Sequence, residues 1–310
     1  MDKIKVVVTG GAGFIGSHIV EHWVKDGAEV HIIDNLRSGF ISNVELFPQA
    51  IFHKGSITDR KLVFEVLKEA DYVHHFAAMV SVPESIQKPD ECYEINVNGL
   101  LNVLDASKEF GIKKIVFSSS AAVYGDEPES PQTIKSKTAP KSPYGSTKLE
   151  GEKQLEIYNQ MHGLGGISLR YFNVFGPRQN PKSQYAAAVP IFLTKAIKNE
   201  PIVIYGDGEQ TRDFIFIKDV VDANIAAATN RNVNGVFNIA TGKAISINQL
   251  ARMIIDITNS KSKIVYETER AGDIKHSLAS VKETENILKF FSQFDIKSGL
   301  IETARYFESL

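Results

Sequence analysis

The feature that most constrains the fold is a glycine-rich turn near the amino terminus, within VVVTGGAGFIGSHIV. Gly10, Gly13 and Gly16 follow a β-branched run that predicts a strand, and they open a stretch with helical spacing. There the first glycine permits a tight turn, the second lets a pyrophosphate approach the backbone, and the third lets helix and strand pack closely. Because a helix N-terminus also offers N–H groups and a positive dipole, the segment predicts a dinucleotide-binding loop.

An acidic residue at the end of the next predicted strand supports the same interpretation. Asp34, in HIIDN, is placed to accept a hydrogen bond from a ribose hydroxyl. Its negative charge would repel a 2′-phosphate, so the pattern favours NAD over NADP. Arg37, three residues later, is a mild signal in the opposite direction.

Strand-like and helix-like segments alternate along the first half of the chain. Apolar runs predict strands at 4–10, 28–34, 50–55, 71–78, 113–120 and 167–176. Helical spacing is present at 14–26, 59–69, 90–110 and 143–162. This alternation indicates an α/β fold, a doubly wound parallel sheet of the Rossmann type with helices on both faces.

The pattern loosens after about residue 175. Short strands such as PIVIYG and GVFNIA are mixed there with helices expected near 185–198, 218–229, 246–258 and 298–308. We therefore expect an NAD-binding domain at 1–175 and a smaller mixed α/β lobe at 176–310. Some segments of the lobe could return to the first domain.

Composition argues against several classes of protein. A net charge of −2 gives no bulk attraction to nucleic acid. The single cysteine, Cys92, excludes an intramolecular disulfide and a cysteine-cluster metal site, and His74 and His75 lack metal-ligand spacing. The apolar runs are too short to span a bilayer, and the first residues lack the pattern of a signal peptide. We expect a cytoplasmic protein with no metal, no nucleic-acid partner and no membrane segment.

The stretch SPYGSTK places Tyr144 and Lys148 one turn apart on a helix predicted to begin at Pro143. By itself this spacing fits a surface pair equally well. Ser118 to Ser120, however, end the strand predicted at 113–120, at the edge where parallel sheets bind ligands. The order of glycine loop, strand-end serine and Tyr-x-x-x-Lys indicates an active site.

These motifs resemble those of the extended short-chain dehydrogenases/reductases, and within them the UDP-hexose 4-epimerases, closest to the UDP-N-acetylglucosamine type. The similarity runs from TGGAGFIGSHIV through SSSAAVYG and SPYGSTK to RYFNVFGPRQNP, GDGEQTRDF and RAGDIKHSLAS. The resemblance implies an NAD-dependent isomerase in which the sugar 4-OH loses a proton as hydride passes to resident NAD⁺. The 4-keto sugar then turns over and hydride returns to its other face. It also implies UDP-sugar binding by the 176–310 lobe, and a homodimer.

The resemblance assigns catalytic roles to Ser120, Tyr144 and Lys148. Tyr144 would take the proton from the sugar hydroxyl. We expect the Lys148 ammonium and the positive nicotinamide ring to lower the pKa of Tyr144 from its usual value of about 10. Lys148 would also hydrogen-bond the nicotinamide ribose, while Ser120 would hydrogen-bond the sugar hydroxyl or relay its proton.

Further positions carry over by motif. Cofactor contacts are expected at Gly10, Gly13, Phe14, Ile15, Gly16, Asp34, Asn35, Ser56, Ile57, Phe76, Ala77, Ala78, Asn96, Tyr144, Lys148 and Tyr171. Substrate contacts are expected at Ser81, Ser120, Asn173, Gln179, Ala187, Arg212, Arg270, Asp273 and Ser277. Two departures concern the cofactor: Ser56 replaces a common acid, and Val80 replaces a lysine found in many galactose-type epimerases.

Ser277 bears on which sugar fits. Four residues after Asp273, epimerases that reject N-acetyl sugars carry a tyrosine, where this chain has Ser277. A small side chain leaves room for an acetamido group and leaves Gln179 free to hydrogen-bond it. We therefore expect interconversion of UDP-GlcNAc and UDP-GalNAc, and also of UDP-glucose and UDP-galactose.

Other functions stay open. They are a strict UDP-glucose 4-epimerase, a UDP-glucuronate 4-epimerase, and a non-catalytic sensor of NAD or nucleotide sugars. Dehydratases that resemble this chain carry an Asp-Glu pair after the strand-end hydroxyl residue, and decarboxylases usually keep the glutamate. Ala121 and Ala122 stand at those positions and argue against both classes.

Overall fold

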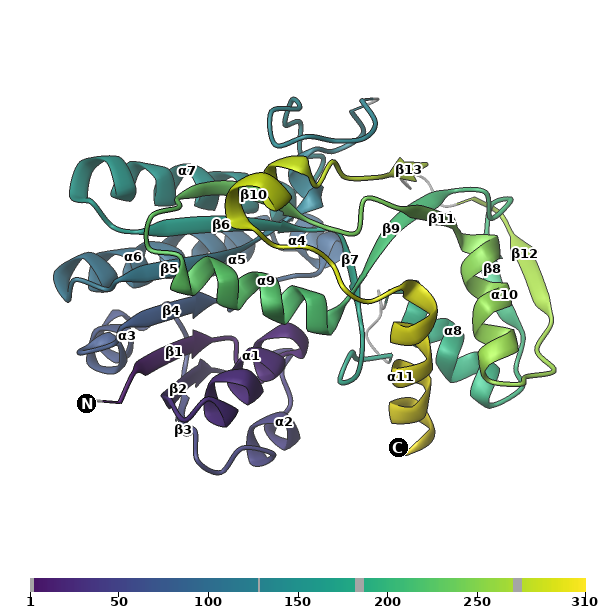
Figure 1. Ribbon diagram of the computed structural model, residues 1–310, viewed down its shortest axis with the longest axis horizontal. Helices are drawn as coiled ribbons and strands as arrows, with labels where there is room; N and C mark the ends of the chain where they lie inside the picture. Colours follow the sequence, from purple (N-terminus) through teal and green to yellow (C-terminus); the bar gives the residue numbers. More distant parts are fainter. Residues whose placement is uncertain (1–2, 128, 182–186, 270–274) are drawn as a thin grey trace.

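The computed structural model of the chain describes residues 3–127, 129–181, 187–269 and 275–310. Its largest element is a seven-stranded sheet with the order β10-β6-β5-β4-β1-β2-β3 (Figure 1). All of its strand pairs are parallel. The strands are β1 (Lys5–Thr9), β2 (Glu29–Asp34), β3 (Ile51–Lys54), β4 (Tyr72–His75), β5 (Lys114–Ser120), β6 (Gly166–Tyr171) and β10 (Gly235–Ile239). The predicted doubly wound fold is confirmed.

Helices cover both faces of this sheet because successive side chains of a strand point in opposite directions. Val6 and Val8 of β1 belong to the core formed with α1 (Phe14–Lys25) and α9 (Ile217–Thr229). Val7 belongs to the core on the other face, which is covered by the remaining helices of this layer, α3 (Arg60–Leu67), α6 (Gly99–Glu109) and α7 (Pro143–His162). The strand order reverses between β1 and β4, which makes that point the expected ligand crevice.

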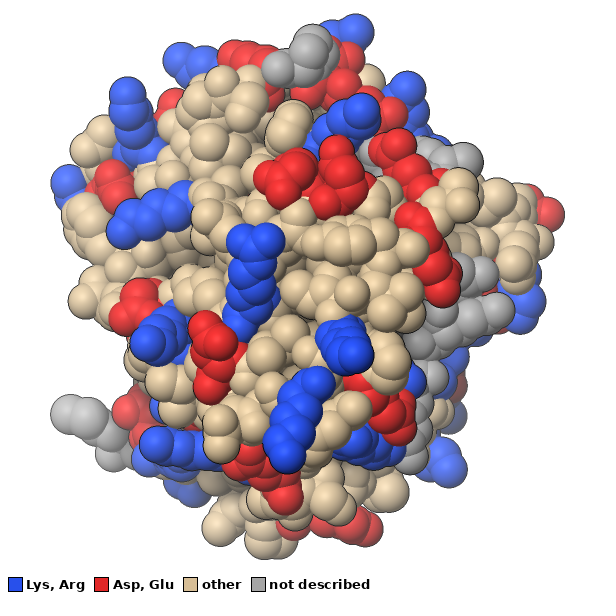
Figure 2. Space-filling model, turned by 90° about the vertical axis from the view of Figure 1, so that its right-hand side faces the viewer, with Lys and Arg blue, Asp and Glu red and all other residues tan. Residues whose placement is uncertain are grey.

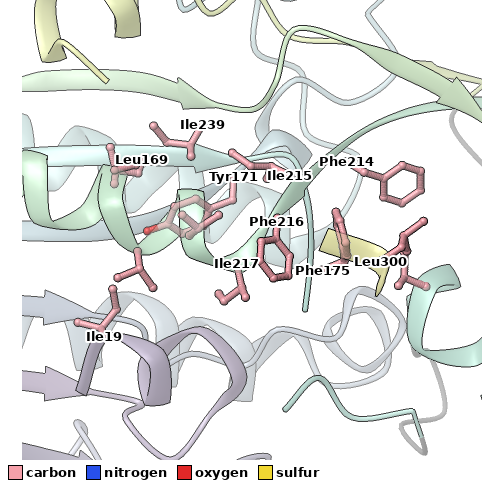
Figure 3. Packing of buried hydrophobic residues seen from close by; sticks show 14 of the residues in the cluster. Ile19, Leu169, Tyr171, Phe175, Phe214, Ile215, Phe216, Ile217, Ile239 and Leu300 are labelled. Atoms are coloured by element: carbon pink, nitrogen blue, oxygen red, sulfur yellow. The ribbon is translucent and has the colours of Figure 1, made fainter. Parts of the chain in front are cut away.

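The strand predicted at 167–176 is two strands in different sheets. The backbone N–H of Phe172 donates to the Ile239 carbonyl at 3.1 Å, and the chain then leaves the large sheet. The next strand, β7 (Asn173–Phe175), pairs with β9 (Thr211–Phe216). Figure 3 shows the continuous core across this junction, from Leu169 and Tyr171 to Phe175 and Phe216. The break links the two parts of the molecule.

The rest of the chain after β7 mostly forms a second α/β layer. β7, β9, β11 (Ala244–Ser246) and β13 (His276–Ser277) make one small sheet, and β8 (Ile202–Tyr205) pairs with β12 (Ile264–Glu267). Three helices accompany them, α8 (Ala188–Ile197), α10 (Ile247–Ile257) and α11 (Ile296–Glu308). Figure 2, which looks onto this side, shows acidic and basic side chains interspersed over the described surface.

Two elements after residue 175 lie with the large sheet. β10 pairs with β6 at its edge, and α9 packs on β4, β5 and β6. The boundary at residue 175 stays a prediction about the chain, while these segments join the first layer in space.

Shorter helices line the connections. They are α2 (Ile41–Glu45), α4 (Val82–Gln87), α5 (Pro89–Tyr93), a π-helical segment at Glu94–Asn98, a 3-10 turn at Ala121–Val123 and a π-helical segment at Thr284–Leu288. The helix predicted at 90–110 is thus α5 and α6 joined through a π-helical turn. Within the described ranges, no helix is both long enough and apolar enough to cross a membrane.

Candidate active site

A cavity of about 470 Å³ lies beyond the carboxyl ends of the parallel strands. The strands β1, β2, β4, β5 and β6, or the loops after them, supply most of its wall. Of the predicted site residues, those that line it are Gly10, Gly13, Phe14, Ile15, Gly16, Asp34, Asn35, Ser56, Ile57, Phe76, Ala77, Ala78, Ser120, Tyr144, Lys148, Tyr171, Gln179 and Ala187. The fold therefore gathers residues from far apart in the sequence around one cavity.

The glycine turn between β1 and α1 leaves no room for side chains at two of its positions. Gly10 has a φ of +73°, and a Cβ there would lie 2.6 Å from the Ala77 nitrogen. A Cβ on Gly16 would lie 2.2 Å from the Gly10 carbonyl oxygen. Gly13 caps the N-terminus of α1 and lines the cavity. The helix N-terminus thus faces a cradle that suits a pyrophosphate.

Asp34 ends β2 with its carboxylate held by the backbone. Its two oxygens accept hydrogen bonds from the Ala12 N–H at 3.0 Å and the Leu36 N–H at 2.7 Å. Burial raises the pKa of Asp34, and these two hydrogen bonds oppose that shift. The side chain is therefore fixed at the cavity wall, where the sequence predicts a ribose contact.

Arg37 is held by two carboxylates instead of facing the cavity as a free cation. Its guanidinium donates to Glu84 at 2.8 Å and also to Glu91. Glu84 belongs to α4 and Glu91 to α5. Since the charge of Arg37 is already paired, it offers little to a 2′-phosphate, in keeping with the preference for NAD predicted from Asp34.

The three predicted catalytic residues meet where β5 ends and α7 begins. The Ser120 hydroxyl lies near the Tyr144 phenol and favours its phenolate, and it accepts from the Ala122 N–H at 3.1 Å. The Lys148 ammonium donates to the Ser118 carbonyl at 2.6 Å and lies 5.8 Å from the centre of the Tyr144 ring. Helix α7 can begin here because the Ser142 hydroxyl accepts from the Gly145 N–H and Pro143 needs no donor.

The expected lowering of the Tyr144 pKa by Lys148 is wrong for the chain itself. Burial is the largest influence and raises the pKa of Tyr144, and the hydrogen bond with Ser120 only partly opposes it. Burial also lowers the pKa of Lys148 to about 8. The physical reason is that the low-polarity surroundings disfavour the charged form of each group more than the pair stabilises it.

The loop that carries Gln179 is hydrogen-bonded to α1, the helix that follows the glycine turn. The Arg178 guanidinium donates to Glu21 and, at 3.3 Å, to the Ser17 hydroxyl. The His18 ring lies 3.0 Å from the Pro177 carbonyl. Since all three contacts are with α1, the cofactor-binding helix fixes the position of Gln179 at the cavity.

Several predicted site residues lie away from the cavity. Asn96 is buried and uses its amide on the Met79 backbone and the Thr147 hydroxyl. Ser81 caps α4, and the Asn173 amide donates to the Asp213 carbonyl at 2.9 Å. Arg212 and Ser277, which are paired across β9 and β13, do not line the cavity either. The predicted residues Arg270 and Asp273 lie outside the described residues.

Comparison with known proteins decides the family. Residues 6–240 match the model of the NAD dependent epimerase/dehydratase family. The chain belongs to that family. A UDP-glucose 4-epimerase of Lacticaseibacillus casei is 34% identical to it, over 96% of this chain and 95% of the relative.

Two solved structures of epimerases are similar over nearly the whole length. A UDP-N-acetylglucosamine 4-epimerase of Methanobrevibacter ruminantium M1, in complex with UDP-N-acetylmuramic acid, has a TM-score of 0.95 and 42% identity, covering 100% of this chain and 99% of that one. A UDP-glucose 4-epimerase of Thermotoga maritima, with UDP-glucose, has a TM-score of 0.93 and 36% identity, covering 99% of each chain. The predicted class, an NAD-dependent UDP-sugar 4-epimerase, and the predicted cofactor are confirmed.

Beyond the residues that the sequence assigned to the site, the cavity is also lined by Ile33, Ser38, Gly55, Ile95, Phe172 and Asn180. Arg37, Val80, Ser118 and Ser119, which the sequence analysis discussed without assigning them to the site, line it as well. Adjacency to a motif could have identified Asn180, which sits beside Gln179. Ile95 carried no such signal, because only the folded chain brings it to the cavity. In the part of the chain that is described, no three His, Cys, Asp or Glu side chains form a group that could hold a metal.

Proposed function

We propose that the chain is a 4-epimerase of UDP-hexoses that accepts N-acetylated sugars. It interconverts UDP-GlcNAc and UDP-GalNAc, and also UDP-glucose and UDP-galactose. The observation that carries the sugar preference is an unpaired acceptor at the cavity, the Oε1 atom of Gln179. The similarity to a UDP-N-acetylglucosamine 4-epimerase at 42% identity supports the same choice.

The Gln179 amide has one settled orientation. One end lies 3.1 Å from the Val174 carbonyl oxygen, which can only accept a hydrogen bond. The amide nitrogen must therefore stand there, and Oε1 is a buried atom for which the described residues supply no hydrogen-bond partner. Leaving such an acceptor unpaired costs about 1–3 kcal/mol. The N–H of an acetamido group is a donor that would pair it.

Proton transfer in the proposed reaction belongs to Tyr144. Its phenolate would accept the proton of the sugar 4-OH and later return it. The Ser120 hydroxyl near the phenol favours its phenolate, and the cationic Lys148 lies beside the same ring. When bound, NAD⁺ supplies a hydride acceptor and donor at the sugar carbon, and a positive charge that favours the phenolate. Gly10, Gly13, Asp34 and the start of α1 would hold the cofactor.

The same residues bear on three alternative functions. A sensor would bind NAD and UDP-sugar without converting them, yet Ser120, Tyr144 and Lys148 are assembled as catalysis requires. A UDP-glucuronate 4-epimerase would need donors for a carboxylate, and Ala121 and Ala122 offer no hydroxyl. A strict UDP-glucose 4-epimerase would leave the Gln179 acceptor without a use.

The deciding experiment is turnover of UDP-GlcNAc and UDP-glucose by the purified protein, with the product epimers resolved by anion-exchange chromatography. We expect both to be converted. Replacing Gln179→Met keeps the volume and removes the acceptor. It should lower kcat/KM for UDP-GlcNAc about tenfold, equal to about 1.4 kcal/mol, and leave UDP-glucose nearly unchanged. An equal loss for both sugars would assign Gln179 a general role instead.

Ser277→Tyr tests the part of the pocket that the structure leaves open. Ser277 is half-buried in β13, beside Arg212 of β9, and does not line the cavity. If Ser277 nevertheless admits the acetamido group, the tyrosine variant should suppress UDP-GlcNAc turnover much more than UDP-glucose turnover. An equal loss of turnover for both sugars, or no loss, would mean that Gln179 and not Ser277 determines the preference for N-acetylated sugars.

We also propose that the enzyme is a homodimer. Its support is a set of exposed apolar side chains on two neighbouring helices, α5 and α7. Tyr93 of α5 is 45% exposed, and Ile157 and Met161 of α7 are 43% and 71% exposed. The second copy would cover these side chains.

A further inference from the structure

Three consecutive residues at the end of β5 contact three residues spaced one turn apart along α7. The Ser118 carbonyl accepts from Lys148, and the Ser120 hydroxyl lies near the Tyr144 phenol. Between Ser118 and Ser120, the Ser119 hydroxyl donates to the Glu152 carboxylate at 2.5 Å. Because residues four apart on a helix share a face, these three contacts join the strand end to the face of α7 that carries Tyr144, Lys148 and Glu152. Two of these contacts hold the catalytic residues, and the third ends at Glu152.

Glu152 is also half of a buried ion pair. Arg170 of β6 donates to it through two nitrogens, at 2.8 and 2.7 Å, and the two side chains are only 6% and 4% exposed. Arg170 directly precedes Tyr171, which lines the cavity. A third guanidinium nitrogen donates to the Tyr124 hydroxyl at 2.9 Å, and that hydroxyl donates to Asn238 of β10 at 2.6 Å.

The Glu152 carboxylate therefore joins α7, β5 and β6 directly, and β10 through Tyr124. A buried ion pair of this kind is weak evidence for stability, since apolar residues of similar volume often serve as well. Its geometric effect is more specific. The elements that it ties together carry Ser120, Tyr144, Lys148 and Tyr171.

We propose that Glu152 is a positioning residue for epimerisation, which holds the ends of β5 and β6 against α7 at the spacing that Ser120, Tyr144 and Lys148 require. It touches neither cofactor nor substrate, since it lies behind the cavity wall. The inference rests on the proposed epimerase activity for its kinetic test, and on geometry for the rest.

The charge of Glu152 adds a second effect on Lys148. Burial lowers the pKa of Lys148 to about 8, while the Cys92 thiol and the Glu152 carboxylate act in the opposite direction. The other titratable groups that face Lys148 are Tyr144 and His75, and burial keeps His75 neutral by lowering its pKa to about 3. Glu152 thus helps Lys148 stay protonated as pH rises, so activity that needs the ammonium should extend further into the alkaline range.

The test compares Glu152→Gln with wild type. We expect kcat for UDP-glucose to fall about tenfold to a hundredfold, the loss that misplacing catalytic groups produces, while UDP binding and bound NAD change less than about threefold. The alkaline limb of the kcat profile should move to lower pH. A wild-type value of kcat and an unmoved limb would overturn the proposal. Absence of any wild-type turnover would instead count against the proposed function.

A readout independent of turnover is the titration of Lys148 by NMR in protein labelled at lysine Cε, with Lys148→Met to assign the signal. We expect the titration to shift to lower pH in Glu152→Gln. An unchanged titration would refute the electrostatic part.

Three variants separate the contributions. Ser119→Ala removes the strand contact and keeps the charge of Glu152, so kcat should fall without movement of the alkaline limb. Because Ser119 also lines the cavity, NAD binding by this variant is measured alongside and should be unchanged. Glu152→Gln with Arg170→Gln removes both buried charges and keeps the test valid if the single variant does not fold. Glu156→Gln makes the same charge change one turn further along α7, at an exposed position, and should match wild type. Wild-type kcat in Ser119→Ala, or an equal effect of Glu156→Gln, would contradict the proposal.

Discussion

Tyr144 is influenced by its surroundings in two opposing directions. Burial disfavours its phenolate, while the Ser120 hydroxyl favours it through a hydrogen bond. In the proposed reaction the phenolate is the proton acceptor. Because burial raises the pKa of Tyr144, the free protein holds this base in its protonated form at neutral pH. The reactive state then depends on the ligands that share the cavity.

Replacing Tyr144→Phe keeps the ring and its packing but removes the proton acceptor. We expect kcat to fall by about 10²–10⁴, the usual contribution of a general base, with UDP-sugar binding nearly unchanged. Steady-state kinetics and calorimetric titration of UDP-sugar measure the two quantities. Retention of a tenth of the wild-type kcat would remove Tyr144 from the role of principal base.

Cofactor choice is a second prediction for single residues. NAD⁺ should support activity and NADP⁺ should not, because Asp34 repels the 2′-phosphate and Arg37 is paired with Glu84 and Glu91. Asp34→Ala alone should improve NADP⁺ affinity less than Asp34→Ala combined with Glu84→Gln and Glu91→Gln. Fluorescence titration of the apoprotein compares the variants. If the two bind NADP⁺ equally, the two glutamates do not restrain Arg37.

That Ser120, Tyr144 and Lys148 line one cavity could be predicted from the sequence, because each belongs to a short motif whose order was informative. The positions of the Asn96 and Asn173 side chains could not be predicted in this way. Matching a motif position does not fix where a side chain points, and the amide of each is used on nearby backbone. Glu152 and Arg170 lay beyond prediction for another reason, since their pairing depends on two elements meeting in space.

At the scale of elements, the alternation of strands and helices predicted the large sheet well. It failed at residues 167–176, because the apolar run continues through Phe172 while the backbone changes sheets. Hydrophobicity is the same on both sides of the break, so no local signal marks it. The strands β11 and β13 were missed because they are short, while β9 is as long as β2 and was missed although its apolar end, Phe214 to Phe216, is buried.

The glycine turn gives a prediction that separates folding from cofactor binding. Gly16→Ala would place a methyl group 2.2 Å from the Gly10 oxygen, so we expect it to lower the free energy of unfolding by about 1–3 kcal/mol. Gly13 has an ordinary φ of −78°, and its Cβ would meet only that oxygen, at 3.1 Å. Gly13→Ala should leave stability nearly unchanged and weaken NAD binding. Urea unfolding and NAD titration of both variants check this, and equal stability losses would contradict it.

At the scale of the whole molecule, the dimer proposal can be tested by changing the exposed apolar side chains of α5 and α7. We expect the wild-type protein to have about twice the 34.3 kDa chain mass by light scattering, and Ile157→Glu to shift it towards the monomer. Val265→Glu, at a 42% exposed position of β12, is the matched control and should stay dimeric. A monomeric wild type, or equal effects of both variants, would argue against this interface.

The return of β10 to the edge of the large sheet has a consequence for synthesis on the ribosome. β6 can pair with β5 as soon as it emerges, but its other edge stays unpaired until β10 has been made. At about 5–20 residues per second, that edge is open for several seconds during each round of translation. Of the small sheets, only the pairing of β7 with β9 can form in the meantime, because β11, β12 and β13 follow β10 in the chain. The large sheet is therefore completed before the small ones. Chaperones that shield open strand edges would act on this protein in that interval.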